Sequence, residues 1–149
     1  MFMATSHYHV GNQLHRAEHA MGMAFTEALR PLGITPSQAA VLLHVDRYPD
    51  VNMARLAEVA SVTPQTMHRI VVGLERSKLV HRNQRAGDRK SIYLSLTPAG
   101  ADVLSQAEAI LKAEQEVLRN TFSVQELDAF FDFLQRFEAA FQRPERRHS

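Results

Sequence analysis

Residues 80–100, VHRNQRAGDRKSIYLSLTPAG, are the stretch that most limits the possible folds, because they predict one β-hairpin in an otherwise helical chain. Val80–Gln84 and Ser91–Leu96 are typical of strands, and apolar and polar side chains alternate in the second. The six residues between them, 85–90, hold four charges and a glycine. Since TPAG at 97–100 then starts a helix, we expect a mainly α-helical fold with a small β-hairpin.

Helix-start signals divide the rest of the chain. Thr35 and Pro36 in TPSQ, Asn52, Thr63 before Pro64, and SVQE at 123–126 are each typical of a capped first turn. Apolar side chains recur at helical spacing after each signal, and also before Pro31. We therefore expect helices at about 10–29, 35–47, 53–60, 64–77, 98–118 and 124–141.

The helix expected at 64–77 has two different faces. At 100° per residue, Met67, Ile70, Val71 and Leu74 fall on one side, and the other side is polar and cationic. It follows the short helix at 53–60 after a tight turn. Two helices joined in this way predict a helix-turn-helix, which presents its second helix to the major groove of DNA.

Charge is concentrated in the middle of the chain, although the net charge is only +1. Residues 51–93 contain eight Lys or Arg and three acids, whereas both flanking segments carry a net negative charge. A helix-turn-helix followed by a basic hairpin predicts a winged helix whose wing lies along the DNA backbone or reaches the adjacent minor groove.

Several other classes of protein are disfavoured by composition. Cysteine is absent, which excludes disulfides, thiolate catalysis and cysteine-ligated zinc. With no apolar run of about 18 residues and no secretory signal at the start, we expect a cytoplasmic protein without a membrane partner. We expect no enzyme activity, since phosphate loops, metal-hydrolase motifs and nucleophile elbows are missing from the sequence.

Side-chain chemistry assigns roles within the winged helix. Arg suits guanine, Gln suits adenine and Thr can meet a thymine methyl, so the candidates for base contacts are Gln65, Thr66, His68 and Arg69. First-turn packing is an equally good role for Thr66. The candidates for the DNA backbone and the wing are Arg55, Arg76, Lys78, Arg82, Arg85, Asp88, Arg89 and Lys90. Taken singly, each of these charges could simply be solvated surface.

The stretch ARLAEVASVTPQTMHRIVVGLERSKLVHR, followed by GDRKSIYLSLTPAG, resembles the winged-helix core of MarR-type bacterial transcription regulators. The resemblance extends to the TPSQ helix start and the helical flanks. It implies a six-helix winged helix-turn-helix dimer that is most often a repressor, with a wing Asp that braces an Arg. Those wing positions match Asp88, Arg89 and Lys90. Lys90 replaces a usual Arg and Lys78 a common Gly, and lysine lacks the planar fork of Arg, so Arg89 or Arg85 could take its role.

The last expected helix predicts a homodimer. Five of the eight phenylalanines lie between residues 130 and 141, and such a surface would be an exposed apolar patch in a monomer. The resemblance implies that first and last helices form the dimer. We therefore divide one intertwined chain into dimerisation helices at 1–34 and 99–149 around a DNA-binding core at 35–98. A two-fold dimer places two recognition helices about 34 Å apart, which predicts an inverted-repeat operator.

Histidines raise the question of an effector. His15 and His19 share a helix face, and His44 could add a third ligand for zinc. The resemblance instead implies a pocket for small anions or aromatic molecules, bordered by His15, His19, Met23, His44 and Arg47. The plainer interpretation is that these are polar residues at a helix junction. We expect no bound cofactor, and the alternatives to a ligand-responsive repressor are a zinc-responsive regulator and a winged-helix interaction module that does not bind DNA.

Overall fold

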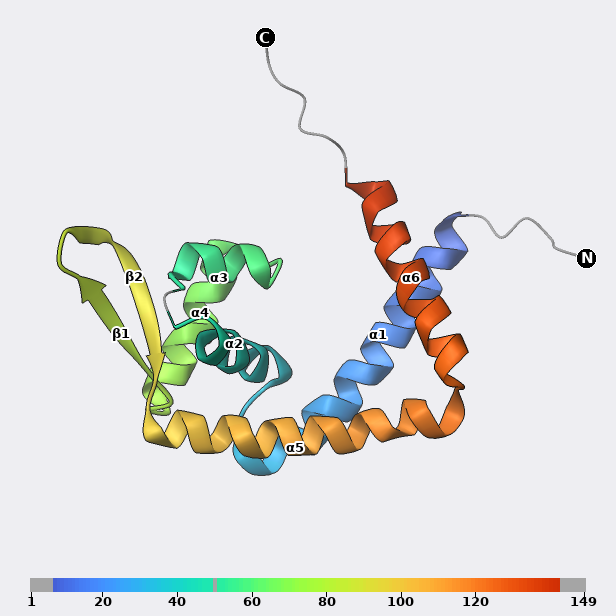
Figure 1. The fold of residues 1–149 in the computed structure, drawn as a ribbon, viewed down its shortest axis with the longest axis horizontal. Coiled ribbons are helices and arrows are strands. Elements are labelled where there is room, and N and C mark those ends of the chain that lie inside the picture. The colour runs from blue at the N-terminus through green and yellow to red at the C-terminus, as the bar shows by residue number, and fades with distance from the viewer. Residues whose placement is uncertain (1–6, 50, 143–149) are drawn as a thin grey trace, which may run out of the picture. The chain divides into compact units, whose positions relative to one another are not determined.

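The computed structural model describes residues 7–49 and 51–142, and the chain forms two compact units, residues 1–114 and 115–149. In chain order the elements are α1 (His7–Leu29), a 3-10 helix (Arg30–Leu32), α2 (Pro36–Arg47), α3 (Met53–Val59), α4 (Pro64–Arg76), β1 (Val80–Arg85), β2 (Asp88–Leu96), α5 (Pro98–Thr121) and α6 (Val124–Phe141) (Figure 1). The predicted α-helical fold with one hairpin is confirmed. Every helix in the described residues is too short or too polar to span a lipid bilayer.

The predicted helix starts are confirmed by their cap hydrogen bonds. Thr35 Oγ1 accepts from the Gln38 amide at 3.2 Å, and Gln38 Oε1 accepts from the Thr35 amide at 2.9 Å. Ser123 and Glu126 form the same reciprocal pair at the start of α6. Because a helix leaves its first amides without partners, these local bonds fix where each helix begins.

The core of the first unit lies among α2, α3, α4 and β2, which pack against one another (Figure 1). Burying each large side chain here stabilises the fold by about 1.5–3 kcal/mol. The predicted apolar face of α4 faces this core, although Ile70 is only half-buried. The largest fully buried side chains are Leu29, Leu42, Leu56, Met67, Leu74, Leu94, Val41 and Val71.

The hairpin differs from the prediction at its tip. The expected six-residue loop is a two-residue turn at Ala86 and Gly87, because the strands continue to Arg85 and start again at Asp88, and these two residues pair. Gly87 has φ +89°, which glycine adopts at little cost and other residues rarely do. Charged side chains at a hairpin tip project into solvent while their backbone still pairs. The charges at 85–90 were therefore no reason for the strands to end.

A tight junction joins α4, the hairpin and α5. Lys78 has φ +57° after the end of α4, and the Leu79 amide returns to the Leu74 carbonyl at 2.9 Å. This is the position where the family commonly has glycine, and lysine there costs roughly 1 kcal/mol. Thr97 Oγ1 donates to the Lys78 carbonyl at 2.7 Å and accepts from the Gly100 amide at 2.9 Å. The wing strands and the start of α5 are therefore tied to the end of the recognition helix.

Apolar side chains remain exposed on α1 and α6. α1 starts at His7, earlier than expected, and of its predicted apolar face Met21 is 49% exposed. In the second unit, α6 buries none of its residues, and Phe131 and Phe141 are 62% and 69% exposed. The rings of Phe133, Phe137 and Phe141 contact one another in sequence, with centroids 5.8 and 5.0 Å apart. Both helices thus carry apolar surface that their own unit leaves open.

Candidate DNA-binding surface

The first turns of α4 present polar side chains to solvent. Gln65, His68 and Arg69 are exposed, whereas Met67 between them is buried. Thr66 is half-buried: its amide donates to Thr63 Oγ1 at 3.2 Å and its hydroxyl accepts from the same atom at 3.0 Å. Thr66 therefore takes part in the helix cap, which is the packing role considered from the sequence, and its base contact stays a prediction.

The turn between α3 and α4 sets how the recognition helix leaves the core. Ser61 has φ +52°, and the Val62 amide returns to the Ala57 carbonyl at 3.0 Å. This closure ends α3 after two turns, so that α4 can begin at Thr63 and Pro64. The predicted helix-turn-helix is thereby confirmed.

The cations around α4 fall into two groups. Arg76 and Lys78 are exposed, and Arg55 is exposed but paired with Glu58 at 2.8 Å on the same helix. An exposed pair of this kind is weak and can open to contact a phosphate. Arg82 differs, because its Nε lies 2.7 Å from Glu75 Oε2 and both side chains are about 30% exposed. The Nε–H does not point along this line, so the contact is an ion pair without a well-aligned hydrogen bond.

The carboxylate of Asp88 is held by hydrogen-bond donors of β2, and its expected bracing of a wing arginine stays a prediction. This carboxylate accepts from the amides of Lys90 at 3.2 Å and Ser91 at 3.0 Å, and from the Tyr93 hydroxyl at 3.0 Å. Hydrogen bonds from the Ser91 side chain and amide, and then from Tyr93, lower the pKa of Asp88. The amides two and three residues along the chain are the nearest donors, and they form a turn typical of aspartate.

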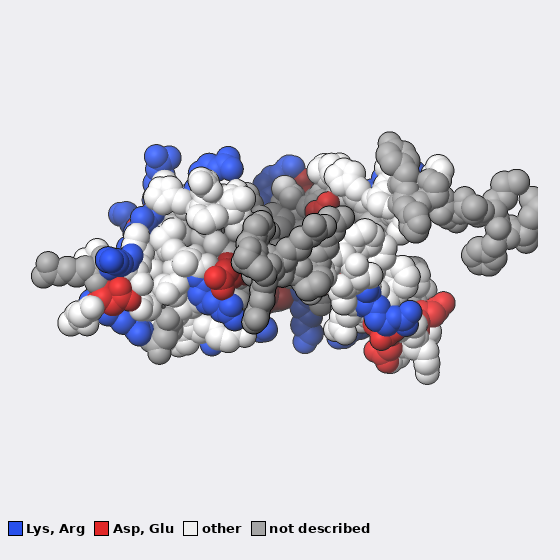
Figure 2. Space-filling model, turned by 90° about the horizontal axis from the view of Figure 1, so that it is seen from above, with Lys and Arg blue, Asp and Glu red and all other residues white. Residues whose placement is uncertain are grey.

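Lys and Arg side chains gather at the end of the first unit that bears the β1–β2 hairpin. Figure 2 shows Lys and Arg over the end of the molecule that bears the hairpin, with few acids among them. Lys90 is exposed in β2, and the guanidinium carbon of Arg85 lies 4.2 Å from the centre of the Tyr93 ring. The backbone of Arg89 lies in β2 between Asp88 and Lys90. An exposed polar helix beside a basic hairpin is the arrangement expected of a winged helix on DNA.

Comparison with known proteins agrees with this geometry. Residues 32–91 match the model of the MarR family. An HTH-type transcriptional repressor of Mycobacterium tuberculosis (strain ATCC 25618 / H37Rv) is 32% identical over 104 residues, which are 70% of this chain and 75% of the relative. The chain belongs to the MarR family. The predicted family and the predicted class, a transcription regulator with a winged helix, are confirmed.

Solved structures of MarR-family proteins share the fold. The repressor CouR, bound to a 23-mer DNA duplex, has a TM-score of 0.81 at 26% identity, with 86% of this chain and 91% of CouR covered. The Staphylococcus aureus MepR–DNA complex has a TM-score of 0.81 at 20% identity and covers 88% of this chain and 97% of MepR. At this lower identity, the second likeness supports the fold alone.

The residues predicted to border an effector pocket lie on two helices. His15 and His19 on α1, with ring centres 6.4 Å apart, line an open hollow of about 310 Å³ together with Arg16. His44 on α2 is half-buried with its ring facing Tyr48, and Met23 and Arg47 are exposed. In residues 7–49 and 51–142 no three His, Asp or Glu side chains form a cluster able to hold a metal. The trio of His15, His19 and His44 is therefore not assembled as a zinc site within this chain.

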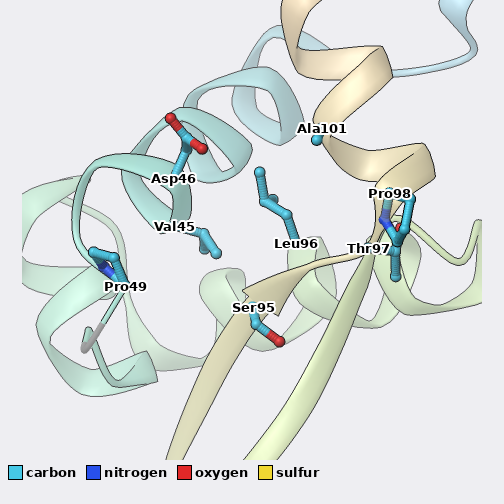
Figure 3. A pocket seen from close by; sticks show the side chains of 8 residues that line it. All are labelled: Val45, Asp46, Pro49, Ser95, Leu96, Thr97, Pro98 and Ala101. Carbon is cyan, nitrogen blue, oxygen red and sulfur yellow. The ribbon is translucent and has the colours of Figure 1, made fainter.

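A second hollow was missed by sequence reasoning. It has a volume of about 380 Å³ and lies where the end of α2 meets the end of β2 and the first turn of α5 (Figure 3). Only the TPAG helix start marked this place in the sequence, since its walls come from segments about 50 residues apart. Its lining residues are Val45, Asp46, Pro49, Ser95, Leu96, Thr97, Pro98 and Ala101.

Proposed function

We propose that the protein is a homodimeric, ligand-responsive repressor of the MarR family that binds an inverted-repeat operator in double-stranded DNA. The observation that carries this proposal is the exposed row of Gln65, His68 and Arg69 at the start of α4, beside a hairpin rich in cations. Such a regulator acts in the cytoplasm of a bacterium, where its DNA lies.

The proposed contacts divide by role. Gln65, His68 and Arg69 read base edges in the major groove, and Thr66 adds a methyl contact from the flank of the helix. Arg55, Arg76 and Lys78 hold phosphates on either side of the groove, which sets affinity and register. Arg85, Arg89 and Lys90 extend this contact along the wing. Arg82 stays paired with Glu75 and orients the first wing strand on α4.

The proposed dimer covers the apolar helices. Residues 1–34 and 99–149 supply the dimerisation helices, and residues 35–98 form the DNA-binding core. In support of this division, α6 leaves Phe130, Phe131, Phe133 and Phe141 about half or more exposed within its own unit. A soluble monomer rarely shows so large a contiguous apolar surface. Light scattering or ultracentrifugation of the pure protein should give twice the mass of 16.8 kDa.

The proposed effector site is the hollow between α2 and the start of α5. β2 runs from the wing straight into this hollow, and Ser95 in its wall accepts a hydrogen bond from Asn83 of β1 at 2.8 Å. A ligand here would therefore change the angle between the wing and the core. It can shift the DNA-binding equilibrium only if it binds the two conformations unequally.

Charge in this hollow favours a cationic or neutral effector over an anion. Among the described residues that line it, Asp46 alone is charged, and it lies in the last turn of α2, where the helix dipole is negative. Pro49 has no amide hydrogen to donate to the Val45 carbonyl, which adds an acceptor to this edge. The hollow lined by His15, Arg16 and His19 instead carries a cation, and we propose it as the site for a small anion. Thermal-shift titrations with benzylamine, benzyl alcohol and benzoate, on the parent and on Asp46→Asn, distinguish the two hollows.

DNA titration tests the main proposal. With the DNA upstream of its own gene, the protein should form a specific complex whose log affinity falls with log salt by about 0.9 per neutralised phosphate. Arg69→Ala should cost about 1–3 kcal/mol and relax preference at one base position, whereas Arg89→Ala should weaken binding to all sequences. Lys112→Ala, an exposed cation on α5, is the matched control and should bind like the parent.

Equal binding to operator and random duplex would contradict the proposal. The remaining function would then be a winged-helix module that binds another protein. A zinc-dependent gain in operator affinity would instead favour the zinc-responsive alternative, in which a partner subunit completes the ligand set.

A further inference from the structure

Tyr93 joins the two sides of the wing tip. One face of its ring lies 4.2 Å from the Arg85 guanidinium carbon, and its hydroxyl donates to Asp88 Oδ2 at 3.0 Å. The other carboxylate oxygen of Asp88 accepts from the amides of Lys90 and Ser91. The residues on both sides of the two-residue turn are therefore connected through one aromatic side chain.

The same tyrosine connects the wing to the helix-turn-helix. Its backbone forms an antiparallel bridge with Asn52, and Asn52 Oδ1 accepts from the Arg55 amide at 2.9 Å as the cap of α3. Tyr93 is half-buried and also pairs with Asn83 in β1. Its ring is thus fixed relative to the core at its backbone end and relative to the turn at its hydroxyl end.

A fixed ring face has a direct effect on a neighbouring arginine. A free arginine side chain carries about 2 kcal/mol of rotamer entropy, much of which is lost when it contacts a phosphate. Contact with the ring restricts the arginine side chain to fewer rotamers before DNA binds, so less entropy is lost on binding. The contact places the guanidinium carbon over the ring, 4.2 Å from its centre, and the phosphate-binding donors of an arginine are its N–H groups.

We propose that Tyr93 is a positioning residue, which holds Arg85 as a wing cation that contacts a DNA phosphate, while Asp88 anchors the tyrosine hydroxyl. This inference rests on the proposed DNA-binding function. It gives a wing-cation role to Arg85 at the end of β1, in addition to the cations that follow Asp88 in the sequence. The carboxylate acts on this cation through the ring.

A double-mutant cycle on operator DNA tests the inference. Arg85→Ala should lower the slope of log affinity against log salt by about 0.9, the value for one phosphate. Tyr93→Leu should keep that slope, because Arg85 is still present, and weaken affinity about two- to fivefold. That fold-change corresponds to the ~0.5–1 kcal/mol of an exposed cation–π contact at ~1.4 kcal/mol per tenfold. In the Arg85→Ala background, Tyr93→Leu should have no further effect.

Tyr93→Phe is the conservative control. It keeps the ring face and removes only the bond to Asp88, which retains its amide donors, so operator affinity should stay within twofold of the parent. Thermal melts of each variant establish that the hairpin and core remain folded. A phenylalanine variant as weak as the leucine variant would overturn the role of the ring face.

Two other results would also overturn the inference. If Tyr93→Leu weakens binding equally with and without Arg85, then Tyr93 only supports the hairpin. If Arg85→Ala leaves the salt slope unchanged, then Arg85 does not contact a phosphate. Both results presuppose specific operator binding by the parent protein. Failure of the parent to bind its operator would reject the proposed function itself, and this inference with it.

Discussion

Replacing Gly100 with alanine tests the junction between the wing and α5. An alanine Cβ at this position would lie 1.9 Å from the Leu79 carbonyl oxygen and 2.9 Å from the carbonyl carbon. Ordinary contact starts at 3.4 Å, so the two segments would have to separate by roughly 1.5 Å. A flexible side chain could move away, but the blocking atoms belong to the backbone.

The expected cost follows from the contacts that this separation would stretch. The Thr97 amide donates to the Leu79 carbonyl at 3.0 Å, and Thr97 Oγ1 donates to the Lys78 carbonyl at 2.7 Å. Two bonds at about 1 kcal/mol each, together with overpacking of about 1–3 kcal/mol, exceed the alanine helix preference of about 0.5–1 kcal/mol. We expect Gly100→Ala to lower the free energy of unfolding by about 3 kcal/mol, or the Tm by about 6–12 °C.

Urea unfolding followed by circular dichroism measures this change. Gly11→Ala is the matched control, since a Cβ at Gly11 would meet no atom within 4 Å and it lies inside α1. We expect Gly11→Ala to be neutral or to stabilise the protein by about 0.5–1 kcal/mol. If Gly100→Ala were as stable as the parent, the close approach of α5 to Leu79 would be wrong.

Three further predictions concern the cap, the ion pair and the wing carboxylate. Thr63→Ala removes the acceptor for the Thr66 amide and should destabilise the fold by about 1 kcal/mol in the same urea assay; an unchanged midpoint would contradict that cap. Arg82→Ala should cost about 1 kcal/mol of stability but leave the salt slope of operator binding unchanged, because the side chain pairs with Glu75; a smaller slope would reveal a phosphate contact. The lowered pKa of Asp88 means that its contribution to stability is complete above its unfolded pKa of about 3.9 and is lost as the pH falls through the folded value. Asp88→Asn should therefore weaken the acid dependence of unfolding, and identical pH profiles for parent and variant would exclude this contribution.

Local chemistry explains which elements could be predicted. Thr35, Asn52, Thr63 and Ser123 each cap the helix that the sequence assigned to them. A cap bond spans only two or three residues, so the residues that form it are adjacent in the sequence. The polar and apolar faces of α4 followed from helical periodicity for the same reason.

Contacts across the hairpin explain what was missed. A charged stretch at 85–90 suggested a loop, but the pairing of Arg85 with Asp88 extends both strands. The bonds of Asp88 to Ser91 and Tyr93 were also missed, since these residues come within reach only once β2 is formed. The contact of Arg82 with Glu75 was missed as well, because it joins the first wing strand to the end of α4.

The sequence by itself determined the order of the helices, the turn between α3 and α4, and the concentration of cations in the middle of the chain. These features depend on interactions within one turn or one strand, whose energies the neighbouring residues fix. Only the tertiary structure decided that Arg85 lies over the Tyr93 ring, that Gly100 touches the Leu79 backbone, and that α2 and α5 border a hollow. Those contacts join residues that are distant in the sequence, and they form only when the buried core brings their elements together.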